Sequence, residues 1–236
     1  MQSFILVVTL VGSIAMVSSS DPTNERVALP DPALDGDVAV EHTLAERRSV
    51  RSFDDAALTL EQIGQLLWAA QGITRPAEAP QGWEWGPWQG GFRTAPSAGA
   101  LYPLELYLVA GRVDGLEPGV YRYVPQDHAL ERAGDDDRRA ALSSAALNQR
   151  SVADAPAIVV VTAVYARTAV KYGDRAERYV HIEVGAAAEN LALQAVAVEL
   201  GTVFVGAFRD GDVQRVLGLP GDHEPLLLMP MGRPEG

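Results

Sequence analysis

Helical periodicity of apolar residues is clearest after residue 59. Thr59 and Gln62 have the spacing of a capping box, in which each side chain bonds the backbone N–H of the other residue. The next residues place their apolar positions on one helical face, and Gly72 ends the run. These positions are Ile63, Leu66, Leu67 and Ala70. The pattern predicts an amphipathic helix that packs on a core.

Strand patterns follow in the middle of the chain. The uninterrupted apolar runs Leu106–Ala110 and Ala157–Ala163 are typical of central strands, which are buried on both faces. Gly119–Val124 (GVYRYV) alternates instead, which predicts a strand with one exposed face.

The last hundred residues mix helical and strand periods. Arg178–Leu200 is the longest predicted helix, and it is alanine-rich and apolar on more than one face, so we expect it to be largely buried. The other predicted elements are helices Arg138–Gln149 and Asp212–Leu217, the second of them capped, and short strands Thr202–Phe208 and Leu226–Met231. The mixture predicts one α+β domain over residues 41–236, with a mixed, mainly antiparallel sheet flanked by long helices.

The first forty residues differ from the rest. Residues 1–20 carry no charge and contain an apolar run, which indicates a signal peptide or a membrane anchor, although the basic start of a signal peptide is missing. A wrongly assigned start codon is the third interpretation. Residues 21–40, rich in Asp and Pro, are predicted to be a tether. We therefore expect an exported or membrane-anchored protein; if this segment is neither signal nor anchor, the expectation is cytoplasmic.

Composition excludes several classes of chemistry. The 236 residues include no cysteine, which rules out disulfides and thiolate catalysis. The formal net charge of −12 argues against a nucleic-acid partner, because such affinity rests on clustered Lys and Arg that neutralise phosphates. His181 and Glu183, two possible ligands on one helix, are too few for a metal site, and none is expected.

A cluster of arginines contrasts with this acidic composition. Guanidinium groups bind phosphate through a planar fork of donors, and a serine hydroxyl adds another donor. The alternative is a solvated basic turn that pairs with Asp54 and Asp55. The candidate anion-binding residues are Arg47, Arg48, Ser49 and Arg51, just after a short helix.

A stretch of small residues precedes the first central strand. Its serine and glycine imitate part of the nucleophile elbow of hydrolases, but the turn leads into a strand rather than a helix, and the histidines are scattered. A backbone surface for a flat ring is the better interpretation, because proline fixes the chain and glycine permits close approach. The residues are Pro96, Ser97, Ala98, Gly99 and Ala100.

The adjacent pair Lys171-Tyr172 stands before the longest predicted helix. Either side chain can exchange a proton if its surroundings lower its pKa. On the residues alone, an ordinary loop leading into the helix is the more common explanation.

Together these stretches resemble the flavin-dependent nitroreductase superfamily, and within it the SagB/ThcOx-type, azoline-oxidase-like dehydrogenases. The resemblance runs in order from about residue 41 to 235. Its motifs are RRSVRSF, LLWAAQGIT, RTAPSAGALYPLELY, GVYRY, KYGDRAERY, VGAAAENLALQA, TVFVGAF and PLLLMPMGRP. One such motif is weak evidence, whereas eight in the right order are strong.

The resemblance implies a homodimer of intertwined protomers with FMN at each subunit interface. It places the arginine segment at the FMN phosphate and ribityl chain, the loop of residues 96–100 along the flavin ring across the dimer, and Val205 and Gly206 near flavin N5. Arg233 matches a late basic residue that reaches the phosphate. Lys171 and Tyr172 match a pair taken to remove a proton while hydride leaves for the flavin.

Two features depart from the family pattern. The long helix has Gly185–Asn190 (GAAAEN) where the family commonly has G-H-x-x-Q-N. An insertion between Arg75 and Gly91 holds Trp83, Trp85 and Trp88, and it is either a lid over an aromatic substrate, a packed surface loop or a dimer contact.

The expected activity is FMN-dependent hydride transfer between a small organic substrate, such as an azoline-like heterocycle, and flavin N5. The first alternative is a nitro- or quinone reductase that uses NAD(P)H as electron donor. An alternative from another class is a flavin-binding protein without turnover.

Overall fold

The computed structural model describes residues 26–236. The predicted signal peptide or anchor and the first part of the predicted tether lie outside these residues. In the described part, no helix is long and apolar enough to cross a membrane.

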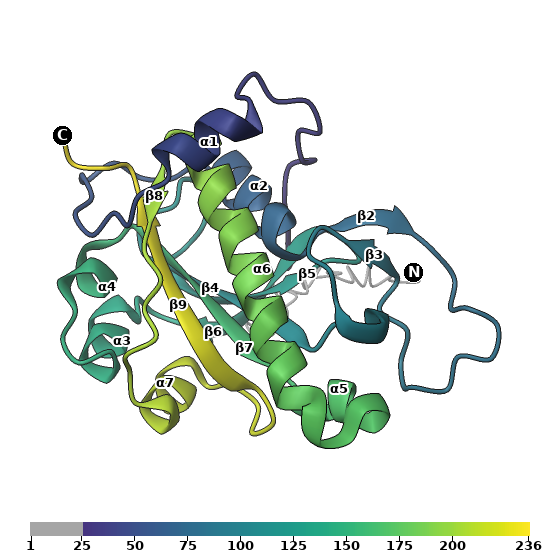
Figure 1. Cartoon of the computed structure of the whole chain (residues 1–236). Helices are drawn as coiled ribbons and strands as arrows, with labels where there is room; N and C mark the ends of the chain where they lie inside the picture. Colours follow the sequence, from purple (N-terminus) through teal and green to yellow (C-terminus); the bar gives the residue numbers. More distant parts are fainter. Residues whose placement is uncertain (1–25) are drawn as a thin grey trace, which may run out of the picture.

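A seven-stranded sheet forms the centre of the molecule (Figure 1). Neighbouring strands pair antiparallel throughout, which confirms the predicted α+β class with a mainly antiparallel sheet. In spatial order the strands are β1 (Arg26–Ala28), β6 (Ala129–Asp135), β5 (Gly119–Val124), β4 (Leu104–Ala110), β7 (Ala157–Ala163), β9 (Glu224–Gly232) and β8 (Gly201–Thr202). The predicted central strands are confirmed as β4 and β7, whose side chains are nearly all buried.

Helices cover both faces of the sheet. One apolar cluster joins the sheet to α2 (Leu60–Gln71) and α6 (Ala176–Ala197). A second cluster joins the opposite face to α3 (Arg139–Ala145), α4 (Arg150–Asp154) and α7 (Asp210–Leu217). The short helices α1 (Val40–Glu46) and α5 (Tyr165–Tyr172) contact α6 near its two ends (Figure 1).

The two helices on the first face form as their sequences predict. The capping box of α2 is present, with Gln62 N donating to Thr59 Oγ1 and Thr59 N donating to Gln62 Oε1. The long helix begins two residues before its predicted start and ends three before its predicted end. Its buried face is largely alanine, so little side-chain volume separates the helix from the sheet; these residues are Ala187, Ala188, Ala192 and Ala195.

A small two-stranded sheet stands apart from the main one. It pairs β2 (Ile73–Pro76) with β3 (Gly91–Arg93), and the Trp-rich insertion is the connection between these two strands. In Figure 1 this hairpin projects beyond the body of the domain.

Three predicted elements need correction. β5 is more buried than predicted, because Val120, on the face expected to be exposed, enters the second core cluster, whereas Arg122 and Val124 on that face are half-buried. The helix predicted over 138–149 ends at residue 145, since Leu147 and Asn148 adopt positive φ angles that no α-helix contains.

The predicted strand Thr202–Phe208 is also wrong as a continuous element. Only β8 and an isolated bridge from Val205 to Leu228 pair with β9, and the chain then turns toward α7.

The predicted tether is wrong from residue 26 onward. β1 pairs with β6, Leu29 is buried, and Ala33 N donates to Gln65 Oε1 at 2.8 Å, so this segment belongs to the domain.

Candidate active site

The loop of small residues before β4 is held in a fixed, uncommon conformation. Gly99, Ala100 and Tyr102 have φ angles of 64°, 55° and 45°. Tyr102 N donates to Ser97 Oγ at 2.9 Å, and Arg93 N donates to the Tyr102 hydroxyl at 3.2 Å. Positive φ is costly for side chains other than glycine, so these bonds are what hold the loop in place.

Gly99 lies against the two predicted proton-transfer residues. A Cβ atom built on Gly99 would lie 2.9 Å from Tyr172 Oη and 3.2 Å from Lys171 Nζ. The approach is too close for a side chain without displacing these groups. The structure therefore brings together the predicted flavin-facing loop and the Lys171-Tyr172 pair, which are seventy residues apart in sequence.

Lys171 and Tyr172 form the last turn of α5 rather than a loop leading into the long helix. The Tyr172 ring packs edge to face on Tyr179 of α6, with 4.9 Å between ring centroids. Lys171 Nζ lies 5.2 Å from the ring centroid of Trp85, within the range of a cation–π contact. Lys171 is exposed in the single chain.

The Trp-rich insertion thus reaches the same place. Trp83 and Trp88 pack edge to face with 4.9 Å between centroids, and Trp88 Nε1 donates to the Ala77 carbonyl at 2.6 Å. These contacts keep the insertion folded on itself and leave the Trp85 ring facing Lys171.

A buried carboxylate lies beneath the loop. Glu183 of α6 is only 2% exposed, and Ser97 donates a hydrogen bond to it. Burial raises the pKa of Glu183 to about 7, although the Ser97 bond and the charge of Arg93 act in the opposite direction. Its Oε1 atom has no hydrogen-bond partner among the described residues. A carboxyl group that titrates near neutrality beside a glycine-containing loop can exchange protons at physiological pH.

The arginine segment follows α1 and lies beside another part of α6. Arg47 Nε lies 3.6 Å from Glu189 Oε1, whereas Arg48 and Arg51 bond only backbone carbonyls within the described chain. The predicted alternative, a basic turn paired with Asp54 and Asp55, does not form, because neither aspartate bonds an arginine of the segment. These exposed guanidinium groups remain available to an anion.

The other residues that were predicted to contact FMN lie at the β8 edge of the sheet; they are Ser49, Val205, Gly206 and Arg233. Ser49 bridges Thr202 of β8, and Val205 N donates to the Leu228 carbonyl at 2.9 Å. Gly206 is exposed, and nothing lies within 4 Å of the position where its Cβ would be. Arg233 directly follows β9, which pairs with β8, and its carbonyl accepts from Asp54 N.

The predicted residues therefore form two groups along α6. One group holds the arginine segment, Val205, Gly206 and Arg233; the other holds residues 96–100 with Lys171 and Tyr172. Six residues of helix, about 9 Å of rise, separate Glu189 at the first group from Glu183 at the second.

Sequence reasoning missed Glu183 as a member of the site. The signal that could have identified Glu183 was a carboxylate within a helix predicted to be largely buried, since charged side chains are rarely buried unless they are paired. It also left Trp85 undecided, because no periodicity predicts where an insertion folds back.

The sequence of residues 44–233 matches the nitroreductase family. The chain belongs to this family and is a flavin-dependent oxidoreductase. A protein of Methanocaldococcus jannaschii whose name assigns it to the nitroreductases is 42% identical over 208 residues, which cover 88% of this chain and 96% of that protein.

Solved structures share the fold. A Ralstonia eutropha structure, also named as a nitroreductase, has a TM-score of 0.73 and 27% identity, and the match covers 96% of this chain and 97% of that one. The Escherichia coli microcin synthetase McbBCD complex with truncated pro-MccB17 has a TM-score of 0.67 at 21% identity, covering 97% of this chain and 85% of that one. The Vibrio harveyi NADPH:FMN oxidoreductase, solved with NAD⁺, has a TM-score of 0.57 at 22% identity, covering 84% and 69%.

Proposed function

We propose that this flavin-dependent oxidoreductase uses FMN to oxidise a small organic substrate of the azoline type, with Lys171 and Tyr172 handling the substrate proton. The observation that carries the proposal is the close packing of Gly99 against both side chains, at 2.9 Å from Tyr172 Oη and 3.2 Å from Lys171 Nζ for a Cβ built there. A proton acceptor belongs beside the flavin only if the substrate loses a proton together with its hydride.

The residues present fit FMN. Arg48 and Arg51 have no carboxylate partner in the described chain, which suits a terminal phosphate. The small side chains of residues 96–100 and the open backbone at Gly206 suit a planar ring. When bound, FMN would supply hydride acceptance at N5.

A homodimer would bring the two groups of residues together. The family resemblance implies that residues 96–100 reach the flavin across the dimer, so a partner that contributes this loop beside the arginine segment would complete both sites. Large apolar side chains exposed over α1 and α6 support such an interface: Val40 and Leu44 are each 57% exposed, and Ile182 is 62% exposed.

The oligomeric state tests this part of the proposal. Light scattering should give twice the chain mass for the wild type, and Ile182→Arg should shift the protein toward a monomer that retains less FMN. Leu147→Arg is the matched control, because Leu147 is 53% exposed but lies between α3 and α4 on the other face of the sheet. A wild-type monomer with full FMN content would contradict the dimer.

In the proposed reaction the substrate loses two electrons and two hydrogens. Bound FMN would accept the hydride from one carbon, and Lys171 Nζ would take the proton from the adjacent nitrogen or carbon, with the Tyr172 hydroxyl orienting the substrate or relaying the proton. Glu183 holds the Ser97 hydroxyl and through it the loop that faces Lys171. Trp85 covers the Lys171 side and offers an aromatic wall to the substrate.

Stopped-flow reduction of the bound flavin decides between this activity and an NAD(P)H-dependent nitro- or quinone reductase. The proposal expects flavin reduction by an azoline-containing donor that depends on Lys171. Rapid reduction by NAD(P)H, with no reduction by any azoline, would establish the reductase instead.

A further inference from the structure

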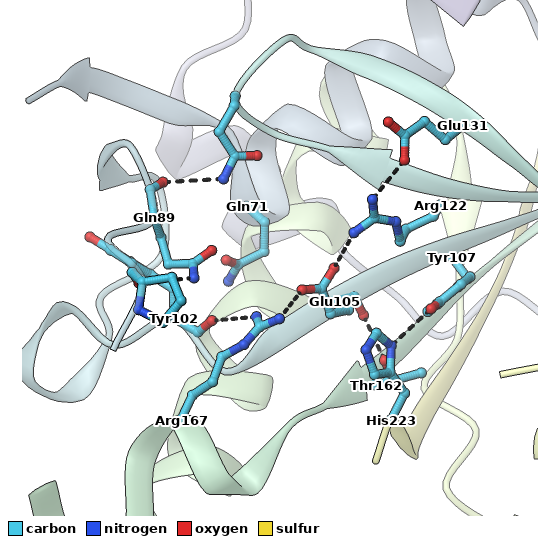
Figure 2. Close-up of polar contacts among 12 residues, drawn as sticks. Gln71, Gln89, Tyr102, Glu105, Tyr107, Arg122, Glu131, Thr162, Arg167 and His223 are labelled. Carbon is cyan, nitrogen blue, oxygen red and sulfur yellow. Dashed lines mark hydrogen bonds and ion pairs between the residues drawn. The ribbon is translucent and has the colours of Figure 1, made fainter. Parts of the chain in front are cut away.

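A small polar cavity is lined by Arg93, whose backbone N–H donates to the Tyr102 hydroxyl of the loop before β4. Its volume is about 160 Å³, and α2, β4, β5 and α5 contribute its walls. Figure 2 shows Gln71, Glu105, Arg122 and Arg167 converging on this space from those four elements. Nothing in the proposed flavin chemistry uses these side chains.

Two buried hydrogen-bond donors in the cavity wall lack acceptors. Gln71 is 1% exposed and Arg93 is 8% exposed. Arg93 Nη1 donates to Gln71 Oε1 at 2.8 Å, but Gln71 Nε2 and Arg93 Nε have no partner among the described residues. An unsatisfied buried donor costs about 1–3 kcal/mol, so two of them in one cavity call for an acceptor.

The charges of the side chains that line the cavity also favour a negatively charged ligand. Arg93 makes no ion pair within the described chain, although buried guanidinium groups are normally paired; the carboxylates of Glu105 and Glu183 act on its charge only at longer range. Arg122 and Arg167 share one carboxylate, Glu105, at 3.6 Å and 2.6 Å. Glu131 bonds Arg122 at 2.6 Å but does not line the cavity. Three guanidinium groups therefore face the cavity against one carboxylate.

We propose that this cavity binds a small oxyanion, an inorganic phosphate or the carboxylate of a small metabolite, between Arg93, Arg122 and Arg167. An oxyanion supplies acceptors to both orphaned donors and, unlike a neutral water molecule, also a negative charge for Arg93.

The cavity is connected to the active-site loop through Tyr102. The Arg93 guanidinium lies 4.7 Å from the centroid of the Tyr102 ring, and Arg167 Nη1 donates to the Tyr102 carbonyl at 3.2 Å. Arg167 also stands one helical turn before Lys171 on α5. A bound oxyanion would fix both arginines and thereby hold the loop against α5.

Thermal unfolding of the flavin-saturated full chain tests the site, because bound FMN occupies the arginine segment that would otherwise compete for phosphate. Sodium phosphate or sodium acetate should replace sodium chloride at constant ionic strength. A saturable rise in Tm is expected, since a ligand that binds only the folded state stabilises it. The salt that raises Tm at the lower concentration shows whether the cavity prefers a phosphate or a carboxylate.

Gln71→Glu places a carboxylate where the orphaned amide stands. This variant should have a higher Tm than the wild type without added oxyanion, and its apparent affinity for the favoured oxyanion should fall at least about tenfold. Gln65→Glu, on the same helix but outside the cavity, is the matched control and should keep the wild-type response.

A second variant protects the test against misfolding of the first. The Arg122 side chain is 39% exposed, so Arg122→Gln should fold and should also lose at least about tenfold in affinity. A wild-type Tm that shows no saturable response, or equal responses in the wild type and both cavity variants, would overturn the proposal and leave the donors to water.

Discussion

The two groups of residues along α6 differ in how they hold their charges. Near Glu189 the guanidinium groups of Arg47, Arg48 and Arg51 are exposed or half-exposed and bond mainly backbone carbonyls. Near Glu183 a carboxylate is buried under a strained loop, with aromatic rings around the neighbouring Lys171. The first group presents positive charge to the solvent, whereas in the second group burial raises the pKa of Glu183 to about 7.

The difference shows where each kind of function can be built. An exposed guanidinium group stays hydrated until its ligand binds, so a short, exposed segment after a helix is sufficient to form an anion-binding site. A group with a shifted pKa needs burial, which only long-range packing supplies. The following predictions test this contrast, beginning with the largest effect.

Replacing the residues that contact Gly99 should abolish most substrate oxidation. Lys171→Ala and Tyr172→Phe should slow substrate-driven flavin reduction by roughly 10²–10⁴-fold, the usual contribution of general acid–base catalysis. Stopped-flow absorbance of the flavin measures this rate. FMN content should be unchanged, and any reduction by NAD(P)H, which needs no base, should serve as the internal control. Wild-type rates in both variants with every productive donor would make the pair structural.

The arginine segment should affect binding and not proton transfer. Arg47→Ala with Arg48→Ala removes two charge-assisted interactions of about 1.5–3 kcal/mol each, which weakens FMN at least about a hundredfold. Fluorescence titration of the flavin-free protein measures the affinity. Arg150→Ala is the matched control, since Arg150 is an exposed arginine paired with Asp154 inside α4. Unchanged affinity in the double variant would remove the phosphate assignment.

Stability should reveal the buried carboxyl group. The pKa of Glu183 is about 7 in the folded chain against an ordinary value of 4.5, so between these values the unfolded chain loses its proton first and the free energy of unfolding falls as pH rises. Relative to Glu183→Gln, the wild type should lose about 2–3 kcal/mol between pH 4.5 and pH 7.5. Urea unfolding at the two pH values gives the difference. If the free energies of unfolding of the wild type and Glu183→Gln change in parallel with pH, the pKa of Glu183 has its ordinary value.

The smallest effect concerns the aromatic insertion. A partly exposed cation–π contact contributes about 0.5–1 kcal/mol, so Trp85→Ala should raise KM for an aromatic substrate about two- to fivefold and leave FMN affinity unchanged. Trp83→Ala tests the packing of the insertion itself, because Trp83 contacts Trp88 and not Lys171. Equal KM values for Trp85→Ala and the wild type would reduce the insertion to a surface loop.

Local signals predicted most of the architecture. The capping box at Thr59, the apolar run Ala157–Ala163 and the long alanine-rich helix each depend on contiguous residues, and each is present in the structure. The errors arose where tertiary contacts override local pattern. Alternation in GVYRYV does not indicate that Val120 will be buried by the second core cluster. Nothing in the Asp- and Pro-rich residues predicts a strand that pairs with β6 about a hundred positions later.

The candidate site likewise combines residues that the local sequence identifies with residues that only packing brings together. Its arginine segment and its loop of small residues could be identified because their chemistry is concentrated in adjacent positions. The nearness of Gly99 to Lys171, the burial of Glu183 and the position of Trp85 depend on how α5, α6 and the insertion pack, and no spacing in the sequence encodes them.

The pairing of β1 with β6 has a practical consequence for immobilising the enzyme. β1 is the edge strand opposite β8, and six strand spacings of about 4.8 Å place the two edges roughly 29 Å apart. A surface linker attached just before Arg26 would leave from the edge remote from the arginine segment. Because β1 is paired with β6, that attachment point is fixed to the sheet, and the edge that carries the arginine segment should face away from an electrode or bead.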